Sequence, residues 1–133
     1  MFPRIDQLLL EARLQLPHRP TAEELPAYRA RGAVIVDIRP IEQRARDGEI
    51  PGSIVIDRNV LEWRLDPTSP HRIPEIAGND QEIVLVCNQG YQSSLAAHTL
   101  QRLGLKRATD LAGGMQGIKR LHSAEPSGKR EQI

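Results

Sequence analysis

The 133-residue sequence contains a single cysteine, Cys87, so it cannot form an internal disulfide or a zinc site built from several thiolates. Aromatic residues make up only 3% of the chain, which predicts a core of leucine, isoleucine, valine and alanine. No apolar run approaches the roughly 18 residues of a membrane helix, and the N-terminus lacks the cleavage pattern of a signal peptide. We therefore expect a cytoplasmic protein that does not bind membranes.

An excess of one charge is also missing. The chain has 18 basic and 17 acidic side chains, for a formal charge of +1. Proteins that bind nucleic acids through phosphate neutralisation need a concentrated basic surface, so this class is not expected. The pattern contains no cluster typical of a metal site, and we predict neither a metal nor a cofactor. Chain length and ordinary apolar content predict one principal globular domain.

Apolar patterning predicts strands that alternate with helices. Strands are expected at residues 33–38, 53–56, 83–86 and 109–111, and the two longest are continuous apolar runs of the kind found in buried parallel strands. Helices are expected at residues 5–16, 41–47, 93–103 and 114–121, with a further short helix between the capping box at residues 21–24 and Gly32. This order is typical of an α/β domain with a mainly parallel sheet.

Cys87 directly follows one of these buried strands and precedes a short loop and a helix. Ligands of parallel α/β sheets bind beyond the carboxyl ends of strands, where loop amides and a helix N-terminus favour an anion. Gly90 allows close approach of the backbone, while Ser93 and Ser94 can cap the helix or donate to an anion. The alternative is that Cys87 is an inert, buried small hydrophobe, and the residues alone leave both interpretations open.

Four motifs in order resemble those of single-domain rhodaneses, a sulfurtransferase family. They are Val36–Arg39, Gly48–Ile54, Val86–Ser94 and Asp110–Met115. The resemblance covers residues 21–121 and implies a rhodanese-like α/β fold, with a central, mainly parallel five-stranded sheet flanked by helices on both faces. Residues 1–20 would then form an N-terminal amphipathic helix and linker, and residues 122–133 a disordered tail.

The resemblance also implies an activity. Cys87 would be the catalytic nucleophile, taking a sulfane sulfur from a small donor such as thiosulfate or a persulfide and passing it to a thiol or cyanide acceptor. The residues expected to bind the substrate are those of the loop: Asn88, Gln89, Gly90, Tyr91, Gln92 and Ser93. Asp37 and Arg39 would support this loop as a buried or half-buried ion pair.

The loop after Cys87 departs from the family pattern in its charge. Many rhodaneses carry arginine or lysine within the loop, whereas residues 88–92 contain no charge and Gln92 occupies the usual place of the cation. Arg58 and Arg64 are candidates for supplying positive charge from outside the loop, because their segment follows the strand at 53–56. The alternative is that both are ordinary surface arginines.

Two further functions remain open from the sequence. The domain could be a persulfide carrier or protein-interaction module with little turnover, and the N-terminal helix could contact a protein partner. A cysteine phosphatase is less well supported, because that class needs an arginine six residues after the cysteine. This chain has Ser93 at that position.

Overall fold

The computed structural model describes residues 3–124, and its centre is a parallel sheet of four strands in the order β2-β1-β3-β4. The strands are β1 (Val34–Asp37), β2 (Ile54–Val55), β3 (Ile83–Val86) and β4 (Ala108–Asp110). β1 and β3 pair along their whole length, from Val34 opposite Ile83 to Asp37 opposite Val86. Every residue of these two strands is buried, which explains why they are continuous apolar runs.

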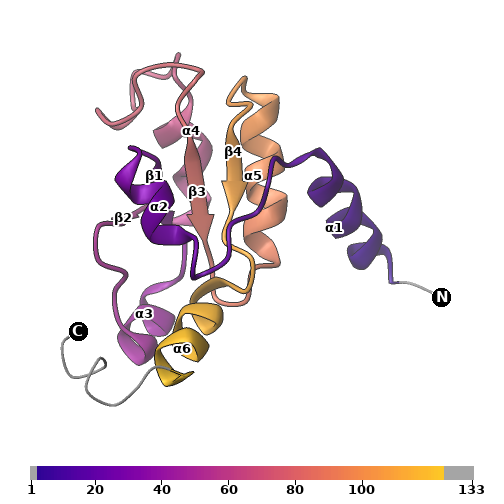
Figure 1. The fold of residues 1–133 in the computed structure, drawn as a ribbon. Helices are drawn as coiled ribbons and strands as arrows, with labels where there is room; N and C mark the ends of the chain where they lie inside the picture. Colours follow the sequence, from indigo (N-terminus) through magenta and orange to yellow (C-terminus); the bar gives the residue numbers. More distant parts are fainter. Residues whose placement is uncertain (1–2, 125–133) are drawn as a thin grey trace.

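Helices cover both faces of the sheet, as predicted. One face packs against α4 (Leu61–Leu65) and α5 (Gln92–Arg102), and the other packs against α2 (Leu25–Ala30) and α6 (Gly114–Ala124). The helix α1 (Arg4–Gln15) lies outside α5, away from the sheet (Figure 1). The strands point toward the end of the molecule that holds α3 (Ile41–Asp47) and α6 (Figure 1).

The described residues contain four strands where the resemblance predicts five. The segment that follows α1 runs beside β4, but it is joined there by isolated hydrogen bonds. The Thr109 hydroxyl donates to the carbonyl of His18 at 3.2 Å, and the Ala112 amide donates to that of Pro20 at 2.8 Å. Pro17 and Pro20 have no N–H group, so this segment cannot donate a regular ladder of hydrogen bonds.

The remaining differences concern the end of one helix and one additional helical segment. α6 continues to Ala124, past the predicted end of the helix at residue 121, and the rest of the predicted tail lies outside the described residues. A 3-10 turn (Arg58–Val60) and α4 occupy a segment for which no helix was predicted. In residues 3–124 no helix has the length and apolar character needed to cross a bilayer.

Candidate active site

Cys87 lies at the carboxyl end of β3, where the chain leaves the sheet. Its side chain is buried, with 6% of the residue exposed, and it reaches a cavity of about 340 Å³. The cavity is lined by Arg39, Pro40, Gln43, Cys87, Asn88, Gln89, Tyr91 and Gln92. A sulfur in this position is shielded from bulk solvent yet accessible to a small molecule that enters the cavity.

Gly90 brings the loop back over the sulfur. Its amide donates a hydrogen bond to Cys87 Sγ at 3.2 Å. Gly90 has a φ of +85°, which disfavours other residues, and a Cβ at this position would lie 2.8 Å from the Gly113 nitrogen. Glycine is therefore required here for two reasons, and it allows the chain to turn tightly enough to place an N–H group on the sulfur.

The first turn of α6 holds the loop from behind. The amides of Met115 and Gln116 donate to the carbonyls of Cys87 and Asn88, at 2.9 and 3.0 Å. Across a trans peptide the carbonyl and the following N–H point in opposite directions. These contacts therefore turn the N–H groups of Asn88 and Gln89 away from α6, toward the side on which both residues line the cavity.

Several loop amides have no protein acceptor among residues 3–124: those of Asn88, Gln89, Tyr91 and Gln92. Successive N–H groups in such a loop form a concave site for an anion, and the start of α5 adds a partial positive charge. The loop therefore has the features needed to hold negative charge at or beyond Sγ, although none of its own side chains is charged.

A buried polar network lies beside the sulfur. Cys87 Sγ is 3.2 Å from Ser93 Oγ, and this hydroxyl donates to Asp110 Oδ2 at 2.6 Å. Ser94 donates to the same carboxylate oxygen at 2.8 Å. Asp110 is fully buried at the end of β4, and its charge is balanced by Arg19, whose Nε lies 2.7 Å from Oδ1.

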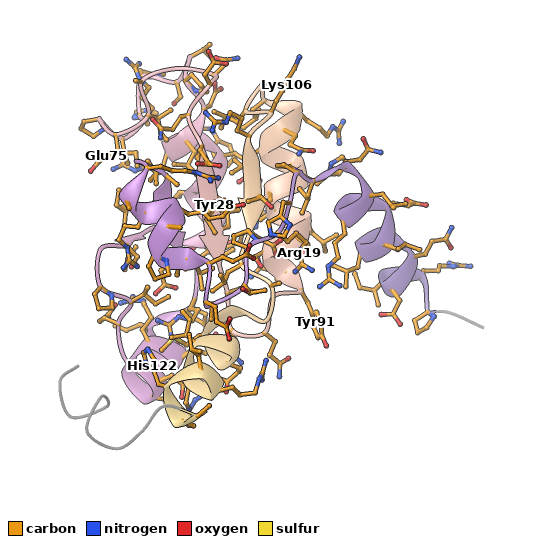
Figure 2. The ribbon with its side chains drawn as sticks, in the orientation of Figure 1. Arg19, Tyr28, Glu75, Tyr91, Lys106 and His122 are labelled. Atoms are coloured by element: carbon orange, nitrogen blue, oxygen red, sulfur yellow. The ribbon has the colours of Figure 1, made fainter. Side chains whose placement is uncertain are left out.

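Two arginines from the N-terminal segment meet at the loop. Arg13 of α1 donates to the Gly90 carbonyl at 2.7 Å and to Ser94 Oγ at 3.1 Å, and Arg19 donates to the same carbonyl at 3.0 Å. Burial, and next the adjacent Arg19 guanidinium, lower the pKa of Arg13. The buried carboxylate of Asp110 opposes that shift. In Figure 2, Arg19 and Tyr91 lie toward the end of the sheet at which the strands finish.

Asp37 and Arg39 form a buried ion pair at the next strand end. Arg39 donates to both carboxylate oxygens, at 3.0 and 2.8 Å, and to the Gly48 carbonyl at 2.8 Å. Both side chains are inaccessible to solvent. Arg39 also lines the cavity at Cys87, and its Nη1 is buried without a hydrogen-bond partner among the described residues. The ion pair therefore fixes Arg39, which lines the cavity, to the end of β1 and to the backbone at Gly48.

The two arginines expected to add charge from outside the loop are placed differently. Arg58 pairs with Glu62 at 2.9 Å and lines a second cavity of about 400 Å³, which shares Arg39, Pro40 and Gln92 with the first. Arg64 donates to the carbonyl of His71 at 2.8 Å and lines neither cavity.

Three charged residues of the site were not singled out from the sequence for a role there: Arg13, Arg19 and Asp110. Asp110 carries a usable signal, because it ends a strand and the carboxyl ends of neighbouring parallel strands meet at one edge of the sheet. No comparable signal marks the two arginines. They reach the loop from 71 and 77 residues away in sequence, through packing of α1 against α5 that periodicity does not specify.

Comparison with known proteins places this arrangement in a family. The model of the rhodanese-like domain matches residues 21–121. A protein of Bacillus subtilis (strain 168) named "Putative sulfur carrier protein YrkF" is 32% identical over 82 residues, which are 62% of this chain and 39% of that protein.

Solved structures share this fold. RPA3614 from Rhodopseudomonas palustris CGA009, a protein of unknown function described as a possible tyrosine phosphatase, is 35% identical with a TM-score of 0.79. That similarity covers 91% of this chain and 92% of that one. The human single-domain sulfurtransferase TSTD1 is 26% identical with a TM-score of 0.64, covering 81% of this chain and 97% of that one. The fold, the match to the domain model and these neighbours show that the chain belongs to the rhodanese-like domain family.

Proposed function

We propose that the protein is a sulfurtransferase that carries a sulfane sulfur on Cys87. The Cys87 thiolate attacks the outer sulfur of a donor such as thiosulfate or a persulfide. A new S–S bond forms, the donor's S–S bond breaks, and sulfite or a thiolate leaves with the bonding electron pair. A cyanide or thiolate acceptor then attacks the outer sulfur of the Cys87 persulfide, and the Cys87 thiolate leaves with its electron pair.

The loop amides are the observation that carries this proposal. Both steps need an anion to be stabilised at the sulfur, first the attacking thiolate and then the terminal sulfur of a persulfide. The Gly90 amide already donates to Sγ at 3.2 Å. The amides of Asn88, Gln89, Tyr91 and Gln92, which have no acceptor within residues 3–124, supply further donors in the same loop. Neither step requires a cofactor or an added oxidant or reductant.

The side chains of the loop and of the adjoining cavity are proposed to select the donor. Asn88, Gln89, Tyr91 and Gln92 line the space next to Cys87, and Arg58 lines the cavity that adjoins it. A donor longer than thiosulfate could extend past Gln92 and place an anionic group near Arg58. Arg58→Ala should then raise KM for such a donor more than for thiosulfate, with Arg64→Ala as the matched control.

Steady-state transfer from thiosulfate to cyanide tests the proposal. A reaction through a persulfide gives parallel double-reciprocal lines, because the first product leaves before the acceptor binds. The Cys87→Ser variant should keep the fold but form no thiocyanate. Activity that survives this substitution, or intersecting lines, would contradict a sulfur intermediate on Cys87. The chemistry also suits a reducing compartment such as the cytoplasm, which keeps a lone thiol free.

A persulfide carrier with little turnover is the second candidate. It is favoured by the name of the Bacillus subtilis relative and by the absence of a charged side chain in residues 88–92, which weakens binding of a free dianion. A carrier would load one sulfur in a single turnover but would turn over slowly with every small acceptor. Comparing the single-turnover loading rate with kcat separates the two functions.

Phosphatase chemistry is less well supported by this site. The description of RPA3614 raises it, but a cysteine phosphatase needs an arginine in the loop to bind the phosphate oxygens. The position that would hold this arginine is Ser93, whose hydroxyl is buried and bonded to Asp110. We expect no hydrolysis of p-nitrophenyl phosphate.

A further inference from the structure

The Cys87 loop is neutral, yet two guanidinium groups contact it from a segment outside the residues that match the domain model. That model begins at residue 21, whereas Arg13 belongs to α1 and Arg19 to the linker that follows it. Both donate to the carbonyl of Gly90, at 2.7 and 3.0 Å. Two cations on one carbonyl repel each other, as the lowered pKa of Arg13 reflects, after the larger effect of burial.

We infer that Arg13 and Arg19 are positioning residues of the Cys87 loop, and that α1 with its linker is part of the catalytic unit. They supply from the N-terminal segment the positive charge that the loop itself lacks. The inference concerns the reactivity of the Cys87 sulfur toward anions, so it can be tested whether or not the proposed sulfur transfer occurs.

The first contribution is geometric. Fixing the Gly90 carbonyl toward the guanidiniums directs the Tyr91 N–H the opposite way, because the peptide between these residues is trans. The contacts of α6 have the same effect on the amides of Asn88 and Gln89. The loop is therefore held from two sides, by α6 at its start and by the N-terminal arginines at Gly90.

The second contribution is electrostatic. The Arg13 guanidinium lies 5.6 Å from the centroid of the Tyr91 ring, and Tyr91 lines the cavity that Cys87 reaches. Arg19 is partly neutralised by Asp110, whereas Arg13 makes its hydrogen bonds to the neutral oxygens of Gly90 and Ser94. Arg13 therefore contributes the larger net positive charge, and an anion that approaches Cys87 experiences it.

Two alkylating reagents of similar size separate charge from packing. Iodoacetate is an anion and iodoacetamide is neutral, and both react with a cysteine thiolate. We compare their rates at Cys87 in the full chain for the wild type, Arg13→Gln and Arg13→Lys. Arg4→Gln, an exposed residue of the same helix, is the matched control. Circular dichroism and thermal unfolding establish that each variant is folded.

The inference predicts that Arg13→Gln slows iodoacetate about fivefold more than iodoacetamide at low salt, the effect of removing one partly screened charge. Arg13→Lys should restore most of the rate with iodoacetate, high salt should reduce the difference, and Arg4→Gln should behave as the wild type. An unchanged ratio of the two rates in Arg13→Gln would overturn the electrostatic contribution, and two rates that both stay as in the wild type would overturn the geometric contribution as well. If the wild type takes up no sulfur from any donor but the alkylation rates of the variants change as predicted, the proposed function alone is contradicted.

Discussion

Each end of the parallel sheet carries a carboxylate paired with arginine, but the two pairs differ in burial. At the carboxyl end, Asp110 is fully buried and bonded to Arg19, with Ser93 and Ser94 on the same carboxylate. At the amino end, Glu82 pairs with Arg31 at 2.6 Å and lies 3.6 Å from Arg107, and both arginine side chains are more than half exposed. The described residues that line the cavity beside Glu82 include no cysteine, serine or threonine.

This difference shows what the buried pair does. An exposed ion pair contributes little to stability, because water screens it and the long side chains lose entropy. A buried pair requires that every charge and hydrogen bond be satisfied, and it therefore fixes the groups around it. Through Ser93 and Ser94, Asp110 holds the first turn of α5 and the polar surroundings of Cys87 in one arrangement.

Replacing each carboxylate separately should give the largest difference between the two ends of the sheet, measured as the loss in free energy of unfolding. Asp110→Ala leaves Arg19 and the two serine hydroxyls without their acceptor inside the protein, and we expect it to lower the free energy of unfolding by at least about 3 kcal/mol. Glu82→Ala should cost less than about 1 kcal/mol. Urea unfolding followed by circular dichroism measures both. Equal losses for the two variants would contradict the assigned roles.

A glycine at each of the two sites extends the comparison: Gly90 in the Cys87 loop and Gly32 beside the cavity at Glu82. Gly90 and Gly32 have similar φ angles, +85° and +95°, but a Cβ on Gly32 would meet nothing within 4 Å. Gly32→Ala should therefore cost only the backbone strain, about 1 kcal/mol. Gly90→Ala adds a clash with the backbone of Gly113 and displaces the amide from Sγ.

We expect Gly90→Ala to slow alkylation and sulfur loading of Cys87 by at least about tenfold, since it disturbs the hydrogen bond from the Gly90 amide to the reacting sulfur. Gly32→Ala should leave both rates unchanged. Rates measured on folded protein test this, and the account fails if Gly90→Ala reacts as fast as Gly32→Ala.

The smallest effect concerns pH. Hydrogen bonds from Arg31 hold the pKa of Glu82 below its ordinary value of 4.5. A carboxylate with a lowered pKa contributes stability above that value, and the contribution is lost as the pH falls through the lowered pKa. Glu82→Gln should therefore reduce slightly the loss of stability on acidification below about pH 4.5. Thermal unfolding midpoints at several pH values measure the change, and identical acid profiles for both proteins would argue against it.

Local patterns in the sequence predicted the parts of this fold that depend on them. The apolar runs of β1 and β3 and the spacing of α5 follow from burial, and the place of Cys87 follows from the end of a strand. The sequence shows the two prolines after α1, but it does not show that their segment lies beside β4. Their effect, the absence of a fifth strand there, could therefore not be predicted. The role of Gly90 was partly visible, since glycine in a loop indicates close approach of the backbone.

The arginines that contact the Cys87 loop could not be identified from local sequence patterns. The chain is rich in arginine, and a guanidinium on a long, flexible stem reaches a carbonyl far away in sequence only if tertiary packing places it there. Arg58 and Arg64 were chosen because they follow a neighbouring strand, whereas α1 brings Arg13 to the loop by packing on α5. This packing depends on a few apolar contacts, such as the buried Ala12, that resemble those of any amphipathic helix.

Intact-mass spectrometry of the full chain after exposure to thiosulfate and to organic persulfides tests the central claim most directly. The account predicts that the mass of the wild type increases by one sulfur atom, that cyanide or dithiothreitol removes this sulfur, and that Cys87→Ser never gains it. A wild-type mass that stays unchanged with every donor, or a sulfur that is also found on Cys87→Ser, would contradict the claim that Cys87 carries sulfur.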